Sequence, residues 1–332
     1  MNILIDTPKG HIRDVFFPEG AIEKLKELGN VILNDTDIPL GEEEIVKYIK
    51  DVDICITHWD TPKLSDKVIE SANRLRLVAH AAGSVANIIT DRVYEKGIKV
   101  CSANTIMARY VAEGVLAYIL AGLRNIPEHD RDIRNGGWNR KIEQSRTLFG
   151  EKLGLIGLGT VGSFLLELLK PFGVIIRLYD PYISSAALAG YPDVETGTLE
   201  DVLTWANIIS VHASLTPETR HLLDKKRLSL VQSGALFVNT ARGAVIDEEA
   251  LTDELCSGRF KAVLDVFGKE PLELDSRLRK LENVILMPHV AGATAREQMT
   301  FAIIEEIRRY INGEPLEYEI PYKKYKLMTK ER

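Results

Sequence analysis

Several features that would point to particular protein classes are scarce in this sequence. The 332 residues include three cysteines, Cys55, Cys101 and Cys256, an odd number without the spacing of a metal site. We therefore expect small core residues in a reducing compartment and no metal centre. Basic residues are fewer than acidic ones, with 42 Lys and Arg compared with 48 Asp and Glu. The resulting net charge of -6 indicates no nucleic-acid partner.

Long hydrophobic runs are also missing. The most apolar stretch, residues 111–123, contains Glu113 and is shorter than a membrane-spanning helix requires. Met1 leads directly into an apolar segment at residues 2–5, which leaves no room for a signal peptide. We found no internal repeat and no low-complexity tract. These observations predict a cytoplasmic protein without a membrane partner.

What is present is an alternation of short apolar strands and helices along most of the chain. Hydrophobic residues make up 45% and charged residues 27%, as in ordinary soluble proteins, and the length suggests about two domains. The first part of the chain reads as a complete parallel α/β unit of its own. Its expected strands are residues 3–5, 31–34, 54–57, 77–79 and 99–101.

A glycine-rich turn lies in the second part of the chain. An apolar strand at residues 153–156 runs into a Gly-x-Gly-x-x-Gly motif, a helix follows, and the next strand ends at Asp180. Such glycines let a pyrophosphate approach backbone N–H groups at a helix N-terminus. Asp180 would accept hydrogen bonds from the adenosine ribose and repel a 2′-phosphate, which favours NAD over NADP. The predicted NAD contacts here are Gly157, Gly159, Thr160, Val161, Gly162, Asp180 and Pro181.

Four further strands are expected in the second part, at residues 208–212, 235–239, 261–266 and 284–287. Ligands of open parallel sheets bind beyond the carboxyl ends of the strands, so side chains that follow these strands are the candidates for a site. Arg242, Glu270 and His289 follow three of these strands closely. We assign the remaining residues of this edge to the cofactor groove, namely His212, Thr240, Ala241, Asp265 and Gly292.

These residue types suit hydride transfer at a 2-hydroxy acid. A base must take the hydroxyl proton, and His289 fits because imidazole titrates near neutral pH. Glu270 would hydrogen-bond the far ring nitrogen and fix the tautomer. Arg242 can grip a carboxylate or ketone oxygen with two N–H groups. Asp265 would accept from the nicotinamide carboxamide and orient the ring.

The motifs that carry these residues resemble one enzyme family. Val-Asn-Thr-Ala-Arg-Gly at 238–243, Leu-Asp-Val-Phe-Gly-Lys-Glu-Pro at 264–271 and Pro-His-Val-Ala-Gly at 288–292 accompany the glycine turn. Together they are similar to D-2-hydroxyacid dehydrogenases, which include phosphoglycerate dehydrogenases, glyoxylate and hydroxypyruvate reductases and D-lactate dehydrogenases. The resemblance implies Arg242, Glu270 and His289 as the catalytic residues, a homodimer, and a small 2-hydroxy or 2-keto acid substrate. Glu270 disfavours the formate dehydrogenase branch, which has glutamine there.

The resemblance also implies the domain organisation. We predict an α/β protein of two Rossmann-like doubly wound parallel-sheet domains with a cleft between them. The flavodoxin-like substrate domain would comprise residues 1–103 and 294–332, and the NAD-binding Rossmann domain residues 104–293. Two long helices, one beginning near Asn104 and one at residues 294–312, are expected to bridge the domains.

Two departures from the family pattern concern the substrate. The family loop Gly-x-Gly-x-Asp-Asn reads His-Ala-Ala-Gly-Ser-Val-Ala-Asn at residues 80–87, so the acidic residue is missing. Backbone groups of Ala82, Gly83 and Ser84 are still predicted to hold the substrate carboxylate. The family sequence His-x-Pro-Leu reads His-Ala-Ser-Leu at residues 212–215. We add His58, which follows the strand at residues 54–57, to the predicted substrate site, with plain packing as the other interpretation.

Three alternatives stay open. Residues 125–148 are either an arm that packs on a partner subunit or a surface loop anchored by Trp138. Lys9 and Arg13 are expected in a solvated charged loop rather than on a substrate phosphate. The chain as a whole is alternatively an NAD(H)-sensing interaction protein similar to the family's corepressors, although a pure sensor has no need of the proton-transfer residues.

Overall fold

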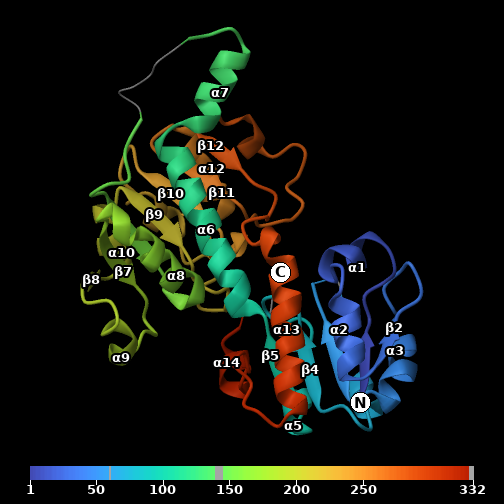
Figure 1. Cartoon of the computed structure of the whole chain (residues 1–332). Coiled ribbons are helices and arrows are strands. Elements are labelled where there is room, and N and C mark those ends of the chain that lie inside the picture. Colours follow the sequence, from blue (N-terminus) through green and yellow to red (C-terminus); the bar gives the residue numbers. More distant parts are fainter. Residues whose placement is uncertain (60, 139–144, 329–332) are drawn as a thin grey trace. The chain divides into compact units, whose positions relative to one another are not determined.

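The computed structural model of the protein describes residues 1–59, 61–138 and 145–328. The chain divides into two compact units (Figure 1). Unit 1 comprises Met1–Ala108 and Ala293–Arg332, and unit 2 comprises Arg109–Gly292. The divisions thus follow residues 108 and 292, compared with the predicted boundaries after residues 103 and 293. Each unit has its own hydrophobic core of strand and helix side chains.

Unit 1 is built on a five-stranded sheet in the order β2-β1-β3-β4-β5. All of its strand pairs are parallel, and the order is the flavodoxin-like one that we predicted. The strands are β1 (Asn2–Ile5), β2 (Asn30–Leu33), β3 (Ile54–Thr57), β4 (Leu77–His80) and β5 (Lys99–Ser102). The helices of the N-terminal part are α1 (His11–Phe16), α2 (Ala21–Leu28), α3 (Glu42–Tyr48), η1 (Ile49–Asp51), α4 (Asp66–Ser71) and α5 (Asp91–Glu95).

The C-terminal part of the chain completes unit 1. Helix α13 (Arg296–Ile311) lies along α2, and the hydroxyl of Thr300 donates to the Phe16 carbonyl (Figure 1). Beyond it, the Ile320 N–H donates to the Val100 carbonyl at 2.8 Å, so this segment extends the edge of β5. A short helix, α14 (Tyr322–Lys326), ends the described chain. The helix expected at residues 294–312 is α13, and it lies in unit 1, to which the chain returns at Ala293.

Unit 2 contains a seven-stranded parallel sheet in the order β12-β11-β10-β9-β6-β7-β8. The chain reverses its winding between β6 and β9, which is the nucleotide-binding position of a Rossmann sheet. The strands are β6 (Lys152–Ile156), β7 (Ile175–Tyr179), β8 (Val194–Thr196), β9 (Ile208–Val211), β10 (Leu236–Asn239), β11 (Lys261–Leu264) and β12 (Val284–Leu286). The helices include α7 (Ile126–Arg134), α8 (Gly159–Leu169), η3 (Lys170–Phe172), α9 (Ser185–Leu188), α10 (Leu199–Trp205), α11 (Lys225–Leu228), η4 (Gly243–Val245), α12 (Glu248–Cys256) and η5 (Arg277–Lys280).

Helix α6 (Asn104–Leu123) begins in unit 1 and continues in unit 2, as predicted for the first bridge. From the sequence we expected a shorter apolar stretch, too short to span a membrane. The helix has 20 residues, and by length and composition α6 could cross a bilayer. Core helices of soluble proteins meet the same criterion. In unit 2 the helix packs closely, since a Cβ at Gly114 would lie 2.9 Å from the Ala291 carbonyl oxygen.

Helix α7 occupies part of the segment that we had treated as a loop or arm. Sequence reasoning missed it because its apolar residues are not buried: Ile126 is 55% and Ile133 50% exposed. In Figure 1 the helix extends away from the rest of unit 2. Trp138 is 75% exposed, so it does not anchor a surface loop. Residues 139–144 of the same segment lie outside the described residues.

Two further expectations were wrong. Cys256 is exposed at the end of α12, whereas Cys55 and Cys101 are buried as expected. Arg13 is buried rather than solvated, and its guanidinium donates at 2.8 Å to the Thr7 carbonyl and also to the Asn34 carbonyl. This side chain therefore ties together the segments that follow β1 and β2.

Candidate active site

The glycine-rich turn connects β6 to α8 and has the geometry of an anion site. Gly157 has a φ of 82° and a Cβ there would lie 2.9 Å from the Ala213 amide nitrogen, so only glycine fits. The N–H groups of Gly159, Thr160 and Val161 open α8 and have no acceptor among the residues that the structure describes. Three free N–H groups at a helix N-terminus suit a pyrophosphate.

Asp180 directly follows β7 and faces the same turn. One carboxylate oxygen accepts from the Leu158 N–H at 2.9 Å, and the other accepts from the Tyr182 N–H at 2.9 Å. These bonds fix the carboxylate beside the glycine turn. Each oxygen retains a second lone pair, so the carboxylate can still accept from ribose hydroxyls. Pro181 is exposed directly after it.

The three predicted catalytic residues follow adjacent strands of unit 2. Arg242 comes after β10, Glu270 after β11 and His289 after β12. The His289 Nδ1 and Glu270 Oε2 atoms are 2.7 Å apart, and the side chains are 49% and 37% exposed. An imidazole whose Nδ1–H donates to a carboxylate keeps Nε2 available for a proton at the surface.

Charge around Glu270 favours its ionised form. Partial burial opposes ionisation, but hydrogen bonds from His289 and from the Phe267 N–H, together with the charges of His289 and Arg242, hold the pKa of Glu270 below its ordinary value. The carboxylate is therefore negative at neutral pH, as a partner that orients an imidazole must be.

Gly243 allows the Arg242 and Glu270 turns to meet. A Cβ at Gly243 would lie 2.0 Å from the Phe267 carbonyl carbon, a distance that no side chain tolerates. The two loops therefore pass each other backbone to backbone. Arg242 donates through Nη1 to the Ala241 carbonyl at 2.7 Å, so its guanidinium is held against the preceding peptide.

Asp265 is buried behind His289 rather than at the surface of the groove. Its carboxylate is 1% exposed and accepts from the Val290 N–H at 2.9 Å and the Ala291 N–H at 3.0 Å. The hydroxyl of Tyr118 also donates to it at 3.3 Å. The predicted contact with a nicotinamide carboxamide stays a prediction, and the structure adds contacts to the His289 turn that the sequence did not suggest.

The remaining groove residues lie along the same edge of the sheet. The His212 ring bonds the Ser210 hydroxyl at 2.8 Å, and burial lowers the pKa of His212 to about 4, so it is neutral at pH 7. Thr240 is buried, and its hydroxyl has no partner within the described part of the chain. Ala241 and Gly292 are partly exposed beside it.

In unit 1, the predicted substrate loop follows β4. The N–H groups of Ala82, Gly83 and Ser84 have no acceptor among residues 1–59, 61–138 and 145–328. The Ser102 hydroxyl donates to the Gly83 carbonyl at 2.6 Å, which helps to fix the backbone of this loop. Consecutive N–H groups of this kind can hold a carboxylate.

His58 is packed among the residues that follow β1 and β3. It is 1% exposed, and its ring centroid lies 4.6 Å from that of Phe16. Its backbone N–H donates to the Thr61 hydroxyl at 2.7 Å, which in turn donates to Asp6 at 3.1 Å. Burial raises the pKa of Asp6 to about 7, although the Thr61 bond acts against this. Packing is therefore evident at His58, and a role in shaping the substrate site stays a prediction.

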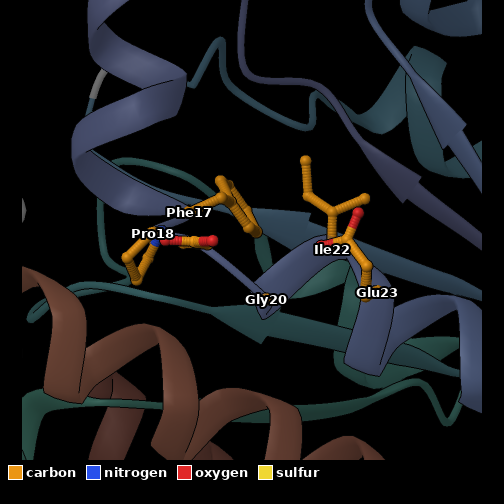
Figure 2. A pocket seen from close by; sticks show the side chains of 6 residues that line it. Phe17, Pro18, Gly20, Ile22 and Glu23 are labelled. Carbon is orange, nitrogen blue, oxygen red and sulfur yellow. The ribbon is translucent and has the colours of Figure 1, made fainter.

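An open hollow elsewhere on unit 1 is not assigned to the site. It lies between α1 and the first turn of α2 (Figure 2) and is lined by Phe17, Pro18, Glu19, Gly20, Ile22 and Glu23. Its two glutamates would repel a carboxylate substrate, and it contains none of the predicted site residues. Within the described residues, no cluster of three or more His, Cys, Asp or Glu side chains could hold a metal ion.

Known proteins share both the motifs and the fold. The family model described as D-isomer specific 2-hydroxyacid dehydrogenase, NAD binding domain, matches residues 116–291, more than half of the chain. The chain belongs to this family. The predicted family is thus confirmed, and so is a nicotinamide dinucleotide as the cofactor of the matched domain.

Relatives within the family differ in their names. A D-3-phosphoglycerate dehydrogenase from Methanocaldococcus jannaschii is 36% identical over 299 residues, which cover 89% of this chain and 56% of that protein. A hydroxypyruvate reductase from Thermotoga maritima is 34% identical over 286 residues, covering 84% of this chain and 92% of that protein. The crystal structure of a phosphoglycerate oxidoreductase from Rhizobium etli superposes with a TM-score of 0.78 at 27% identity, covering 96% of this chain and 97% of that one.

The chain spans about half the length of the curated D-3-phosphoglycerate dehydrogenases that it matches. It matches almost the full length of the reductase. These relatives are named as dehydrogenases or reductases, so they lend no support to the corepressor alternative.

Proposed function

We propose that this protein is an NAD-dependent D-2-hydroxyacid dehydrogenase that also runs as a reductase of small 2-keto acids. The observation that carries the proposal is the 2.7 Å contact between His289 and Glu270, on adjacent strand ends with Arg242. A charged carboxylate that orients an exposed imidazole is the arrangement required to move a proton to or from a substrate oxygen.

Each catalytic residue has one task in this proposal. When bound, NADH supplies a hydride to C2 of the keto acid. His289, protonated, donates its Nε2 proton to the C2 oxygen as that oxygen gains charge, and Glu270 stabilises the imidazolium through Nδ1. Arg242 binds the substrate carboxylate or the C2 oxygen. The products are the hydroxy acid, NAD⁺ and a neutral imidazole, which regains its proton from solvent, and the reverse direction begins from that neutral form.

Residues of unit 1 would bind the substrate carboxylate. The free N–H groups of Ala82, Gly83 and Ser84 support this role. They are hydrogen-bond donors without a net charge, so burial of the site does not oppose them as it would oppose a charged side chain. In unit 2, Asp180 would bind the adenosine ribose and disfavour NADP. The names of the relatives make hydroxypyruvate and phosphorylated hydroxy acids the first substrates to test.

The proposal includes a homodimer located in the cytoplasm. The dimer is supported by α7, which presents Ile126 and Ile133 to solvent together with the nearby Trp138. Apolar side chains on one projecting element favour burial against a second copy of the chain. In such a dimer, α7 would belong to the arm considered from the sequence, one that packs on a partner subunit.

Turnover with a panel of keto acids tests the function. We expect loss of NADH absorbance with at least one of glyoxylate, hydroxypyruvate, phosphohydroxypyruvate and pyruvate. His289→Gln should retain NADH binding and lose about 100-fold or more in kcat, since it removes the proton-transfer group. His221→Gln is a matched control, because His221 is also exposed and also has a positive φ, 51° against 56° for His289. Absence of turnover with every keto acid, or equal rates for the two variants, would contradict the proposal.

A further inference from the structure

The backbone that carries His289 is held in an uncommon conformation. His289 has a φ of 56°, in the left-handed region that residues with a Cβ seldom adopt. The two following N–H groups, of Val290 and Ala291, both donate to the carboxylate of Asp265 at 2.9 and 3.0 Å. Charge-assisted hydrogen bonds from these N–H groups to a buried carboxylate can offset the cost of such a turn. The conformation at His289 therefore depends on where Asp265 is held.

Helix α6 holds Asp265 and the turn from one side. Gly114 and Tyr118 are four residues apart and so lie on one face of the helix. A Cβ at Gly114 would lie 2.9 Å from the Ala291 carbonyl oxygen, so the helix backbone touches the turn directly. One helical turn later, the Tyr118 hydroxyl donates to Asp265 Oδ1, the same oxygen that accepts from Val290.

The phenol of Tyr118 is a stable donor. Burial raises the pKa of Tyr118 above its ordinary value, and the neighbouring Asp265 carboxylate raises it further, so the hydroxyl keeps its proton throughout the working pH range. Asp265 is almost fully buried, so water competes little for this hydrogen bond. Oδ1 then has two donors and Oδ2 has one, which prevents the carboxylate from rotating away from the turn.

We propose that Tyr118 is a positioning residue for proton transfer. Its hydroxyl orients Asp265, Asp265 holds the left-handed turn, and the turn directs the His289 imidazole at Glu270. Tyr118 touches no reacting atom in this scheme. The inference rests on the proposed function for its consequence in catalysis, whereas the effect on the turn is independent of that function.

Tyr118→Phe removes the donor and keeps the ring. The Tyr118 bond to the charged Asp265 is long, at 3.3 Å, and it acts on His289 only through the turn, so we expect kcat to fall about threefold to tenfold. The KM for NADH should change less than about twofold, because the glycine turn is untouched. A less firmly held imidazole is stabilised less well as imidazolium, so the alkaline fall in the reduction rate should move to lower pH.

A second measurement needs neither substrate nor cofactor. Amide hydrogen exchange at Val290 and Ala291 in the free protein should be faster in Tyr118→Phe than in the wild type. Tyr110→Phe is the control, since Tyr110 lies on the same helix and its hydroxyl makes no hydrogen bond within the described residues; neither kcat nor the exchange rates should change. We also expect Gly114→Ala to speed exchange, because its Cβ would press on Ala291.

The outcomes separate this inference from the proposed function. Unchanged exchange at Val290 and Ala291 in Tyr118→Phe would overturn the positioning role, whatever the activity. Faster exchange with an unchanged kcat and pH profile would overturn its part in catalysis. A wild-type protein that reduces no keto acid, with exchange still faster in the variant, would refute the proposed function and leave the structural role intact.

Discussion

Replacing Glu270 with glutamine separates the charge of this side chain from its shape. The carboxylate accepts from two donors, the His289 ring at 2.7 Å and the Phe267 N–H at 3.1 Å. A glutamine has only one acceptor oxygen, so it can satisfy one of the two donors. If its oxygen stays with Phe267, its NH₂ faces Nδ1 and draws the neutral imidazole into the tautomer with the proton on Nε2. That tautomer cannot take a proton from a hydroxy acid.

The expected magnitude follows from the contact. A hydrogen bond to a charged group contributes about 1.5–3 kcal/mol. Since the two side chains are 37% and 49% exposed, solvent screening places the loss toward the lower value, about tenfold in rate. The altered tautomer adds to this in the oxidation direction. We therefore expect kcat to fall about 10-fold for reduction and nearer 100-fold for oxidation.

Steady-state kinetics in both directions would measure these losses. Glu273→Gln is the control, because Glu273 lies three residues further on and its carboxylate pairs, within the described residues, only with the exposed Lys269, at 2.6 Å. The pH dependence carries a sign as well. The lowered pKa keeps Glu270 ionised, and its pair with His289 intact, at any pH above the ordinary glutamate pKa of 4.5. The stabilisation that this pair provides is lost as the pH falls through the folded-state pKa of Glu270. A Glu270→Gln enzyme with more than half of the wild-type kcat in both directions would refute the reasoning.

Two further predictions concern the cofactor turn and the stability of unit 1. Asp180→Asn should raise the KM for NADH about tenfold and that for NADPH much less, because it removes the charge that favours the ribose and repels a 2′-phosphate; equal changes would contradict this. Burial raises the pKa of Asp6 from 3.8 to about 7, so its contribution to stability is present at acid pH and lost as pH rises to about 7. Asp6→Asn should therefore reduce the loss of stability between pH 5 and pH 8, followed by thermal melting, by about 2–3 kcal/mol relative to the wild type, because about two pKa units at about 1.4 kcal/mol each separate pH 5 from the folded-state pKa. Parallel melting curves across pH would show that Asp6 ionises normally.

Local patterns in the sequence carried much of the fold. Strand β3 was predicted at its observed bounds, Ile54–Thr57, because four consecutive apolar or β-branched residues between turns have few other uses. The helix expected directly after the glycine turn is α8, Gly159–Leu169. By contrast α7 was missed. None of its side chains is buried, so its sequence pattern did not point to a helix face packed on a core.

Part of the candidate site could be predicted from local sequence patterns as well. The sequence alone determined that Arg242, Glu270 and His289 follow three strands, because strand ends are local features and neighbouring parallel strands expose their ends together. The glycine turn was recognisable for the same reason, as one strand, one turn and one helix in succession.

Tertiary structure decided which residues support that site. Gly243 had no evident purpose until β10 and β11 brought its backbone against Phe267. Tyr118 and Asp265 are 147 residues apart in sequence, and their contact requires α6 to lie across the ends of the sheet. Asp6 looks like any acid after a strand, and only burial shifts its titration. Composition and periodicity report what a residue prefers, whereas burial and partners at long sequence separation are set by how the elements pack.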